Sequence, residues 1–243
     1  MAKIIEFLQT WGAQLQKTFI EQERYKWLLE GLSNTLIITL GALVIGVALG
    51  TVIATVKYFS DDNKFLKLFG KICDVYVTTI RGIPVVVLLL IFYYLILKSS
   101  EGVVVGIVTF GLNSAAYMAE LIRSGINAVD VGQLEAGRSL GLSKMQTMRK
   151  IIFPQAVKNI LPAIGNEFIA LLKETSVAGY VAVKDLTRAG NLIRNNTFDA
   201  FNPLIVVALV YLILVILLTK LLSRLERRLS KSDRSKKSKK KLR

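Results

Sequence analysis

Histidine is absent from the 243-residue chain, which removes the side chain that most often serves as a general base or a metal ligand. Cysteine occurs once, at Cys73, so neither an internal disulfide nor a thiolate zinc site can form within the chain. No glycine-rich phosphate-binding loop of the GxxxxGKS or GxxxxGKT type is present. We therefore expect no catalytic residue, no metal site and no cofactor in this chain. An intramembrane enzyme is further disfavoured because the clear apolar segments hold no paired carboxylates at one depth.

Apolar residues make up 53% of the sequence and charged residues 20%, with a mean hydropathy of +0.50. This mixture is typical of a membrane protein with several spans and basic edges. The net charge of +15 is concentrated in a basic tail, residues 223–243, which holds eleven basic and two acidic residues. The tail lacks the interleaved aromatic residues of a nucleic-acid-binding segment, so nucleic acid is not an expected partner. We expect a cytoplasmic tail that has no fixed structure in isolation and is attracted to anionic membrane lipids.

Long apolar runs indicate the fold class. A helix needs roughly 20 mostly apolar residues to cross a hydrocarbon core of about 30 Å. Five segments approach that requirement: residues 36–56, 82–97, 102–119, 155–172 and 201–219. The second is short unless it extends back to Asp74, and the fourth is interrupted by Lys158, Pro162 and Glu167. The sequence predicts an all-α membrane protein with five transmembrane helices, within a permease domain of residues 31–222.

The positions of the basic residues predict the orientation. Four lysines lie between the first and second apolar segments, and six basic residues run from Arg123, after the third segment, to Lys158, near the start of the fourth. The opposite loops are short or mixed in charge. Because cytoplasmic loops are enriched in Lys and Arg, and an odd number of spans separates the termini, we expect the N-terminus outside and the C-terminus in the cytoplasm.

Residues 1–30 precede the first apolar segment. Their apolar side chains recur at helical spacing, which predicts an N-terminal amphipathic helix lying on the outer membrane interface. The alternative is an extension of the first span packed against the bundle. The apolar positions are Ile4, Ile5, Leu8, Trp11, Leu15 and Phe19.

The loop of residues 127–154 is long for a connector and contains a helical stretch of its own. We expect a short helix from Gly132 to Leu140, ended by Gly141 at a C-cap position. Small, acidic and apolar residues are spaced through the loop in a fixed order: Glu135, Ala136, Gly137, Gly141, Ile151, Phe153 and Pro154.

This order resembles the cytoplasmic signature of the binding-protein-dependent ABC importer permeases, which is Glu-Ala-Ala, three residues, Gly, nine residues, Ile, one residue, Leu-Pro. Gly137 replaces the second alanine and Phe153 replaces the leucine, and both keep the small or apolar character. In that family the element is a coupling helix that fits a groove on the ATPase subunit, with the glutamate facing a basic residue. The resemblance implies an ATPase-coupling role for Glu135, Ala136, Gly137, Gly141 and Pro154.

Other segments are similar to the branch of this family that takes up polar amino acids. They are GLSNTLIITL at 31–40, RGIP at 81–84, NSAAYMAELIRSGI at 113–126, GQLEAGRSLGLS at 132–143 and NEFIALLKETS at 166–176. The branch usually has threonine where Ile83 stands, so the amino acid that is moved stays open. The resemblance implies a bacterial plasma membrane location and three partners: an ATPase subunit that binds ATP and Mg, an extracellular solute-binding protein, and a second permease subunit that is identical or different.

Polar residues at membrane depth are candidates for the translocation pathway, because each must face a group that satisfies it. Glu167, beside Asn166 and after a proline and a glycine that can distort the helix, is the candidate for holding an ammonium group. Arg81 could complement a carboxylate, although pairing with Asp74 on the same helical face is the favoured alternative. Further polar groups, which equally serve as hydrogen bonds between helices, are Thr78, Thr79, Asn113, Ser114 and Tyr117.

Glu120 and Arg123 are three residues apart, which predicts an ion pair within one helix, with a contact that gates the pathway as the more specific alternative.

An ion-coupled secondary amino acid transporter or a channel would share the spans and the buried charges. Neither of these would need the spacing from Glu135 to Pro154.

Overall fold

The computed structural model describes the backbone of residues 2–60 and 64–241, and the side chains of these residues except 2–5, 7, 8, 64, 65 and 230–241. The chain divides into two compact units, which we call unit 1 and unit 2. Unit 1 comprises Met1–Gly41, Val85–Phe110 and Leu172–Val215, and unit 2 comprises Ala42–Pro84, Gly111–Leu171 and Ile216–Arg243.

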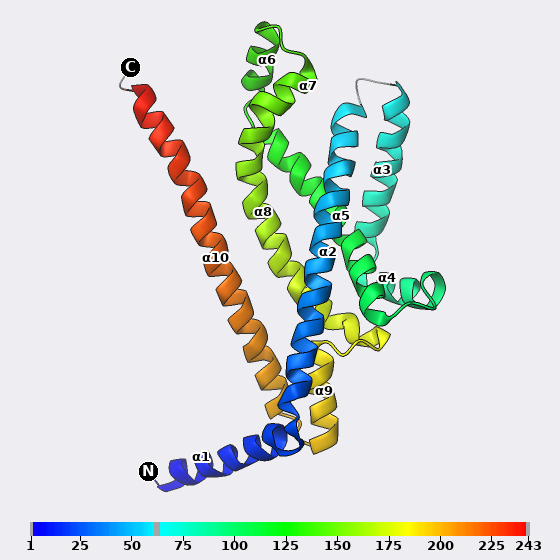
Figure 1. Ribbon diagram of the computed structural model, residues 1–243, viewed down its shortest axis with the longest axis vertical. Coiled ribbons are helices and arrows are strands. Elements are labelled where there is room, and N and C mark those ends of the chain that lie inside the picture. Colours follow the sequence, from blue (N-terminus) through cyan, green and yellow to red (C-terminus); the bar gives the residue numbers. More distant parts are fainter. Residues whose placement is uncertain (1, 61–63, 242–243) are drawn as a thin grey trace. The chain divides into compact units, whose positions relative to one another are not determined.

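The described residues form helices and turns, with no strand among them. The α-helices (Figure 1) are α1 Ala2–Leu15, α2 Tyr25–Phe59, α3 Lys64–Gly82, α4 Val85–Ile91, α5 Gly102–Asn127, α6 Val131–Ser139, α7 Lys144–Thr147, α8 Phe153–Glu174, α9 Leu186–Thr197 and α10 Asn202–Lys241. Short π-helical segments are Gln16–Ile20, Phe92–Ile96 and Met148–Ile152, and 3-10 segments are Glu21–Glu23 and Thr175–Val181.

Among the described residues, three helices are long and apolar enough to cross a membrane: Tyr25–Phe59, Gly102–Asn127 and Asn202–Leu229. They contain the predicted first, third and fifth spans. A bent pair, Leu66–Gly82 and Val85–Ile96, accounts for a fourth if the two helices count as one span. The predicted fourth span lies in α8, a helix of 22 residues whose charges lower its hydropathy. The all-α membrane fold is confirmed, whereas the five spans and their orientation stay predictions.

Two prolines in apolar segments have opposite outcomes. α3 ends at Gly82 and α4 begins at Val85, so the chain breaks at the start of the predicted second span, and the extension back to Asp74 belongs to a separate helix. Pro84 lacks a backbone N–H and disfavours helical geometry at Ile83. By contrast, α8 continues through Pro162, and the expected distortion before Glu167 does not break the helix.

The basic tail is part of a helix in the described residues. α10 continues from Asn202 to Lys241, whereas its composition predicts no fixed structure in isolation. Lys, Arg and Leu are good helix formers, and extending an existing helix avoids the unfavourable nucleation step. Residues 242 and 243 lie outside the described part of the chain.

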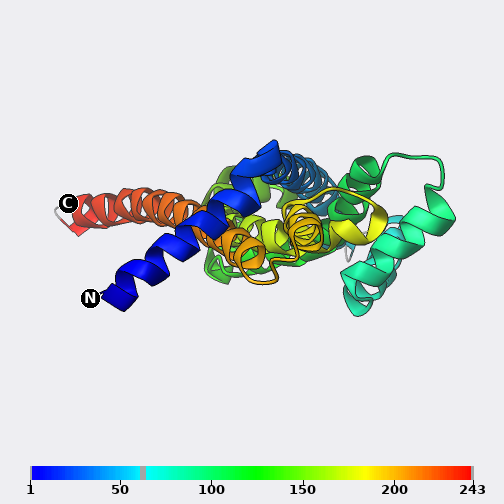
Figure 2. The same ribbon diagram turned by 90° about the horizontal axis from the view of Figure 1, so that it is seen from below.

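In unit 1, α1 is a helix separate from α2. Gln22 and Glu23 have positive φ angles of 57° and 53°, which end the helical path before α2 begins. The buried Arg24 guanidinium holds this turn, donating to the carbonyls of Lys17 (2.9 Å) and Glu21 (3.3 Å) and to the Asn196 side chain (3.0 Å). α1, dark blue in Figures 1 and 2, therefore runs at a steep angle to α2.

A buried polar cluster ties α1 and the following turn to the start of α10. The Asp199 carboxylate accepts from Thr18 Oγ1 (2.8 Å) and Asn202 Nδ2 (2.7 Å), and Trp11 Nε1 donates to Asn202 Oδ1 (2.8 Å). Burial alone would raise the pKa of Asp199, but these hydrogen bonds outweigh it and lower that pKa below its ordinary value. Ile4, Ile5 and Leu8 lie outside the described side chains, so the amphipathic face and its membrane contact stay predictions.

In unit 2, α2 and α5 cross at small residues. A Cβ added to Gly46 would lie 2.7 Å from Ser114 Oγ. A Cβ added to Gly50 would lie 2.5 Å from Met118 Cβ and 3.0 Å from the Ala115 carbonyl oxygen. This spacing of two glycines four residues apart lets two membrane helices approach closely.

We expect Gly50→Ala to destabilise the protein by about 1–3 kcal/mol, because the new methyl group meets backbone atoms that cannot move aside. The measurement is thermal unfolding of the purified chain in lipid nanodiscs. Gly12→Ala is the matched control, since a Cβ at this helical position meets nothing within 4 Å. Equal stability of the two variants would show that the α2–α5 crossing tolerates a wider separation.

Candidate functional site: a docking helix and a charged cavity

The short helix predicted in the loop 127–154 is present as α6, displaced by one residue at each end. Asp130 caps its start by accepting from the Gly132 N–H (2.8 Å). At its end Gly141 has a φ of +77°, and the N–H groups of Gly141 and Leu142 donate to the carbonyls of Arg138 (2.9 Å) and Gly137 (3.1 Å). These two bonds make a Schellman motif, so the predicted C-cap role of Gly141 is confirmed.

Gly137 fixes α6 against the chain that follows it. It is buried, and a Cβ added there would lie 2.5 Å from Thr147 Cγ2. α7, which contains Thr147, begins with a capping box formed by Ser143 and Gln146. Figure 1 shows α6 and α7 beside each other at one end of α8. Gly137, which stands where the family has alanine, therefore allows Thr147 to pack closely against α6.

The opposite face of α6 is free. Glu135 and Ala136 are exposed, and the Glu135 carboxylate makes no hydrogen bond or ion pair with any side chain in the described part of the chain. Two apolar side chains at the ends of the helix are also exposed, Val131 at 67% and Leu140 at 78%. A rigid helix that presents one carboxylate among exposed apolar side chains is suited to docking another protein.

A polar cavity of about 590 Å³ lies among α2, α3 and α5 in unit 2. Lys57 Nζ lies 2.9 Å from Asp74 Oδ1 and 2.9 Å from Glu120 Oε1. Arg123 Nη2 lies 2.7 Å from Glu120 Oε2, so the predicted ion pair within α5 is confirmed. These four charged groups balance one another and join the three helices.

Arg81 also lines this cavity, and its predicted pairing with Asp74 is wrong. Asp74 pairs with Lys57 instead, because residues on neighbouring helices come closer than residues two turns apart on one helix. The Arg81 guanidinium lies 5.1 Å from the centre of the Tyr117 ring, a cation–π contact that leaves its positive charge uncompensated. No ion pair of Arg81 occurs among the described residues.

The other predicted pathway residues are distributed over α3, α5 and α8 of unit 2. Thr78 lines the cavity, whereas Thr79 does not belong to its lining. Ser114 is buried and donates to Glu167 Oε1 at 3.3 Å. The remaining two are Asn113, buried on α5, and Asn166, exposed on α8. Lys57 is the functional candidate that sequence reasoning missed, since it counted only as a loop charge.

A helical membrane protein with a charged cavity between its helices and an exposed docking helix is organised as a permease that works with another protein. The family model for the binding-protein-dependent transport system inner membrane component matches residues 43–231. The chain belongs to this family.

Named relatives agree with the assignment. The chain is 37% identical over 194 residues to a putative glutamine transport system permease protein of Rickettsia bellii, covering 76% of this chain and 84% of the relative. It is 37% identical over 189 residues to an arginine transport system permease protein of Bacillus subtilis, with the same coverage of 76% and 84%. A crystal structure of an amino acid ABC transporter with histidines is 41% identical, with a TM-score of 0.79. The match covers 86% of this chain and 98% of the chain in that structure.

The chain is therefore the membrane-spanning permease subunit of an ABC importer, located in the bacterial inner membrane. It works with an ATPase subunit, which binds the nucleotide, and with a substrate-binding protein. It is not an enzyme and carries no cofactor, because the family consists of transport subunits. The alternatives of a secondary transporter or a channel are not supported.

Proposed function

We propose that the chain moves a polar amino acid inward, as one of a pair of permease subunits, and that the cavity of unit 2 lies on its path. The observation that supports this proposal is the Arg81 guanidinium in that cavity, whose positive charge has no ion-pair partner among the described residues. A guanidinium binds a carboxylate through two parallel hydrogen bonds, and every amino acid offers that group. The named substrates of the relatives, glutamine and arginine, support the same class.

Glu167 is the proposed partner for the ammonium group of the substrate. It is half-buried on α8 and its carboxylate already accepts one hydrogen bond from Ser114, which orients it. A carboxylate in a partly buried polar environment attracts an ammonium group more strongly than it would in water. Glu167 does not line the cavity that contains Arg81. A carboxylate-binding group and an ammonium-binding group at different points of the path favour a zwitterion over a sugar or a simple ion.

The exposed face of α6 is the proposed docking surface for the ATPase subunit. ATP binding would bring the two ATPase subunits of the complex together and carry the docked helices with them. α6 is fixed at both ends by backbone hydrogen bonds and is packed on Thr147 through Gly137. A force on Glu135 would therefore move the adjoining helices of unit 2 instead of unwinding the loop.

The test is uptake by proteoliposomes that contain the chain with its ATPase subunit and substrate-binding protein. We expect ATP-dependent accumulation of one or more of L-glutamine, L-arginine, L-histidine and L-glutamate, with L-leucine as the apolar control. Accumulation should survive ionophores that collapse proton and sodium gradients. Uptake driven by such a gradient without ATP, or no uptake of any polar amino acid, would overturn the proposal.

A further inference from the structure

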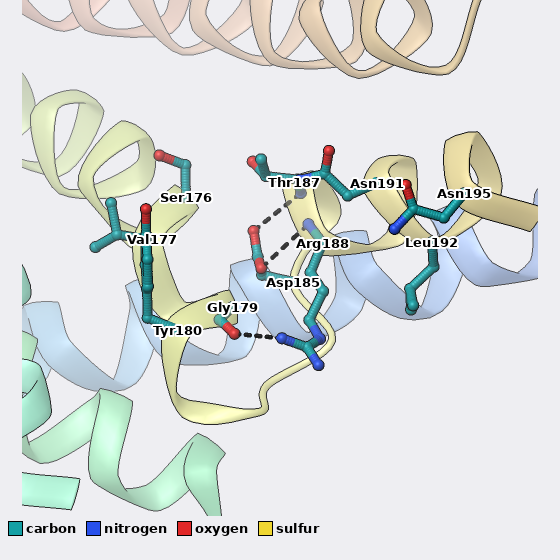
Figure 3. A pocket seen from close by; sticks show the side chains of 10 residues that line it. All are labelled: Ser176, Val177, Gly179, Tyr180, Asp185, Thr187, Arg188, Asn191, Leu192 and Asn195. Atoms are coloured by element: carbon teal, nitrogen blue, oxygen red, sulfur yellow. Dashed lines mark hydrogen bonds between the residues drawn. The ribbon is translucent and has the colours of Figure 1, made fainter. Parts of the chain in front are cut away.

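Unit 1 contains a cavity of its own, of about 640 Å³, which shares no residue with the cavity of unit 2. It lies between the 3-10 segment Thr175–Val181 and α9 (Figure 3). Gly179 allows the two segments to approach, since a Cβ there would lie 2.9 Å from Asp185 Oδ1 and 3.1 Å from Arg188 Cβ.

Arg188 is the one cation that lines this cavity within the described part of the chain. Its Nη1 donates to the Gly179 carbonyl at 2.6 Å, and it makes no ion pair with any described residue. The neighbouring Asp185 is fully buried, and its carboxylate oxygens accept from the N–H groups of Thr187 (2.9 Å) and Arg188 (3.3 Å). Asp185 therefore caps the start of α9 and leaves the guanidinium with donors to spare.

Further polar groups line the same cavity, although Figure 3 shows the Arg188 guanidinium turned toward Gly179 and away from the amides of Asn191 and Asn195. Asn191 and Asn195 follow at three and seven residues, which places them on the same face of α9. Figure 3 shows both amides on successive turns of the helix. Ser176 and Tyr180 contribute hydroxyl groups from the 3-10 segment. Amides and hydroxyls both donate and accept hydrogen bonds, so they can satisfy an ammonium or a side-chain amide.

We propose that this cavity is a second binding site for a polar amino acid, with Arg188 binding the α-carboxylate. The identity of the ligand rests on the proposed function above. A structural role for Arg188 would need only one neutral donor to the Gly179 carbonyl. A half-buried cation with unused donors at the wall of a cavity instead fits an anionic group that arrives from outside.

The first test is uptake kinetics of the reconstituted complex for L-glutamine and L-arginine. Arg188→Gln keeps a donor for the Gly179 carbonyl but loses the charge. We expect its KM to rise at least tenfold, and Arg188→Lys to recover part of the loss. Arg194→Gln removes a charge from the same helix and should leave KM unchanged. An unchanged KM in Arg188→Gln would overturn the proposal.

The second test measures binding without transport. Cys73 is the only cysteine, so Cys73→Ala gives a background in which Asn195→Cys can be labelled alone. We expect millimolar L-glutamine or L-arginine to slow labelling by N-ethylmaleimide at least threefold in the full complex. The carboxylate-free analogues 4-aminobutanamide and agmatine should not. Equal labelling rates with and without the amino acids would overturn the second site, and uptake by the native complex separately decides the proposed function.

Discussion

Glu135→Arg is expected to reduce substrate-stimulated ATP hydrolysis by the reconstituted importer at least tenfold and to reduce uptake equally. The Glu135 carboxylate is exposed and unpaired in the described part of the chain, while the rest of α6 is held in place. In the importer permeases whose signature this loop resembles, the glutamate at this position faces a basic residue of the ATPase subunit. Placing two like charges at a docked contact costs several kcal/mol, which is sufficient to disrupt the contact.

The controls separate docking from folding. Lys71→Glu reverses an exposed charge on α3 and should leave hydrolysis unchanged. Glu135→Gln, which removes the charge without reversing it, should give an intermediate loss. Thermal unfolding of Glu135→Arg should match that of the native chain, because the caps of α6 use backbone groups and Asp130. Full stimulation in Glu135→Arg would show that α6 is not the coupling element.

The docking helix could be predicted because its determinants are local. Its start at Asp130 and its end at Gly141 depend on residues within one turn of each cap. Gly137 and Thr147 are only ten residues apart in the sequence, yet their close contact could not be predicted. Nothing in the spacing of the loop shows that the two residues face each other. Local signals identify an element, whereas its packing depends on neighbours.

The contacts in the charged cavity could not be predicted for the same reason, since they join residues that are farther apart in the sequence. The contact of Lys57 with Glu120 joins positions 63 residues apart, and helical periodicity relates only residues within a few turns. Periodicity accordingly predicted the pair of Glu120 and Arg123 and assigned Asp74 to the wrong partner. The cavity of unit 1 was missed because the loop that contains it was interpreted only as mixed in charge.

Arg81→Gln is expected to raise the KM for uptake of the transported amino acid roughly 10- to 100-fold, the loss that follows from removing hydrogen bonds from a charged donor to a carboxylate. The maximal rate at saturating substrate should change less, since binding is affected first. Arg81→Lys keeps the charge without the planar donor pair and should recover part of the affinity. The measurement is concentration-dependent uptake with the native chain and with Lys71→Gln, an exposed charge loss on the same helix.

A double-mutant cycle decides whether Arg81 acts on the substrate or on Asp74. Because Asp74 contacts Lys57 in this structure, Asp74→Asn and Arg81→Gln should have effects on unfolding free energy that add within about 0.5 kcal/mol. A direct ion pair between the two would instead produce a clear coupling energy, and a substrate role for Arg81 would then lose its physical basis. Additive stability effects with a raised KM only in Arg81→Gln would place the free guanidinium on the path of the amino acid, because no described carboxylate of the chain competes for it.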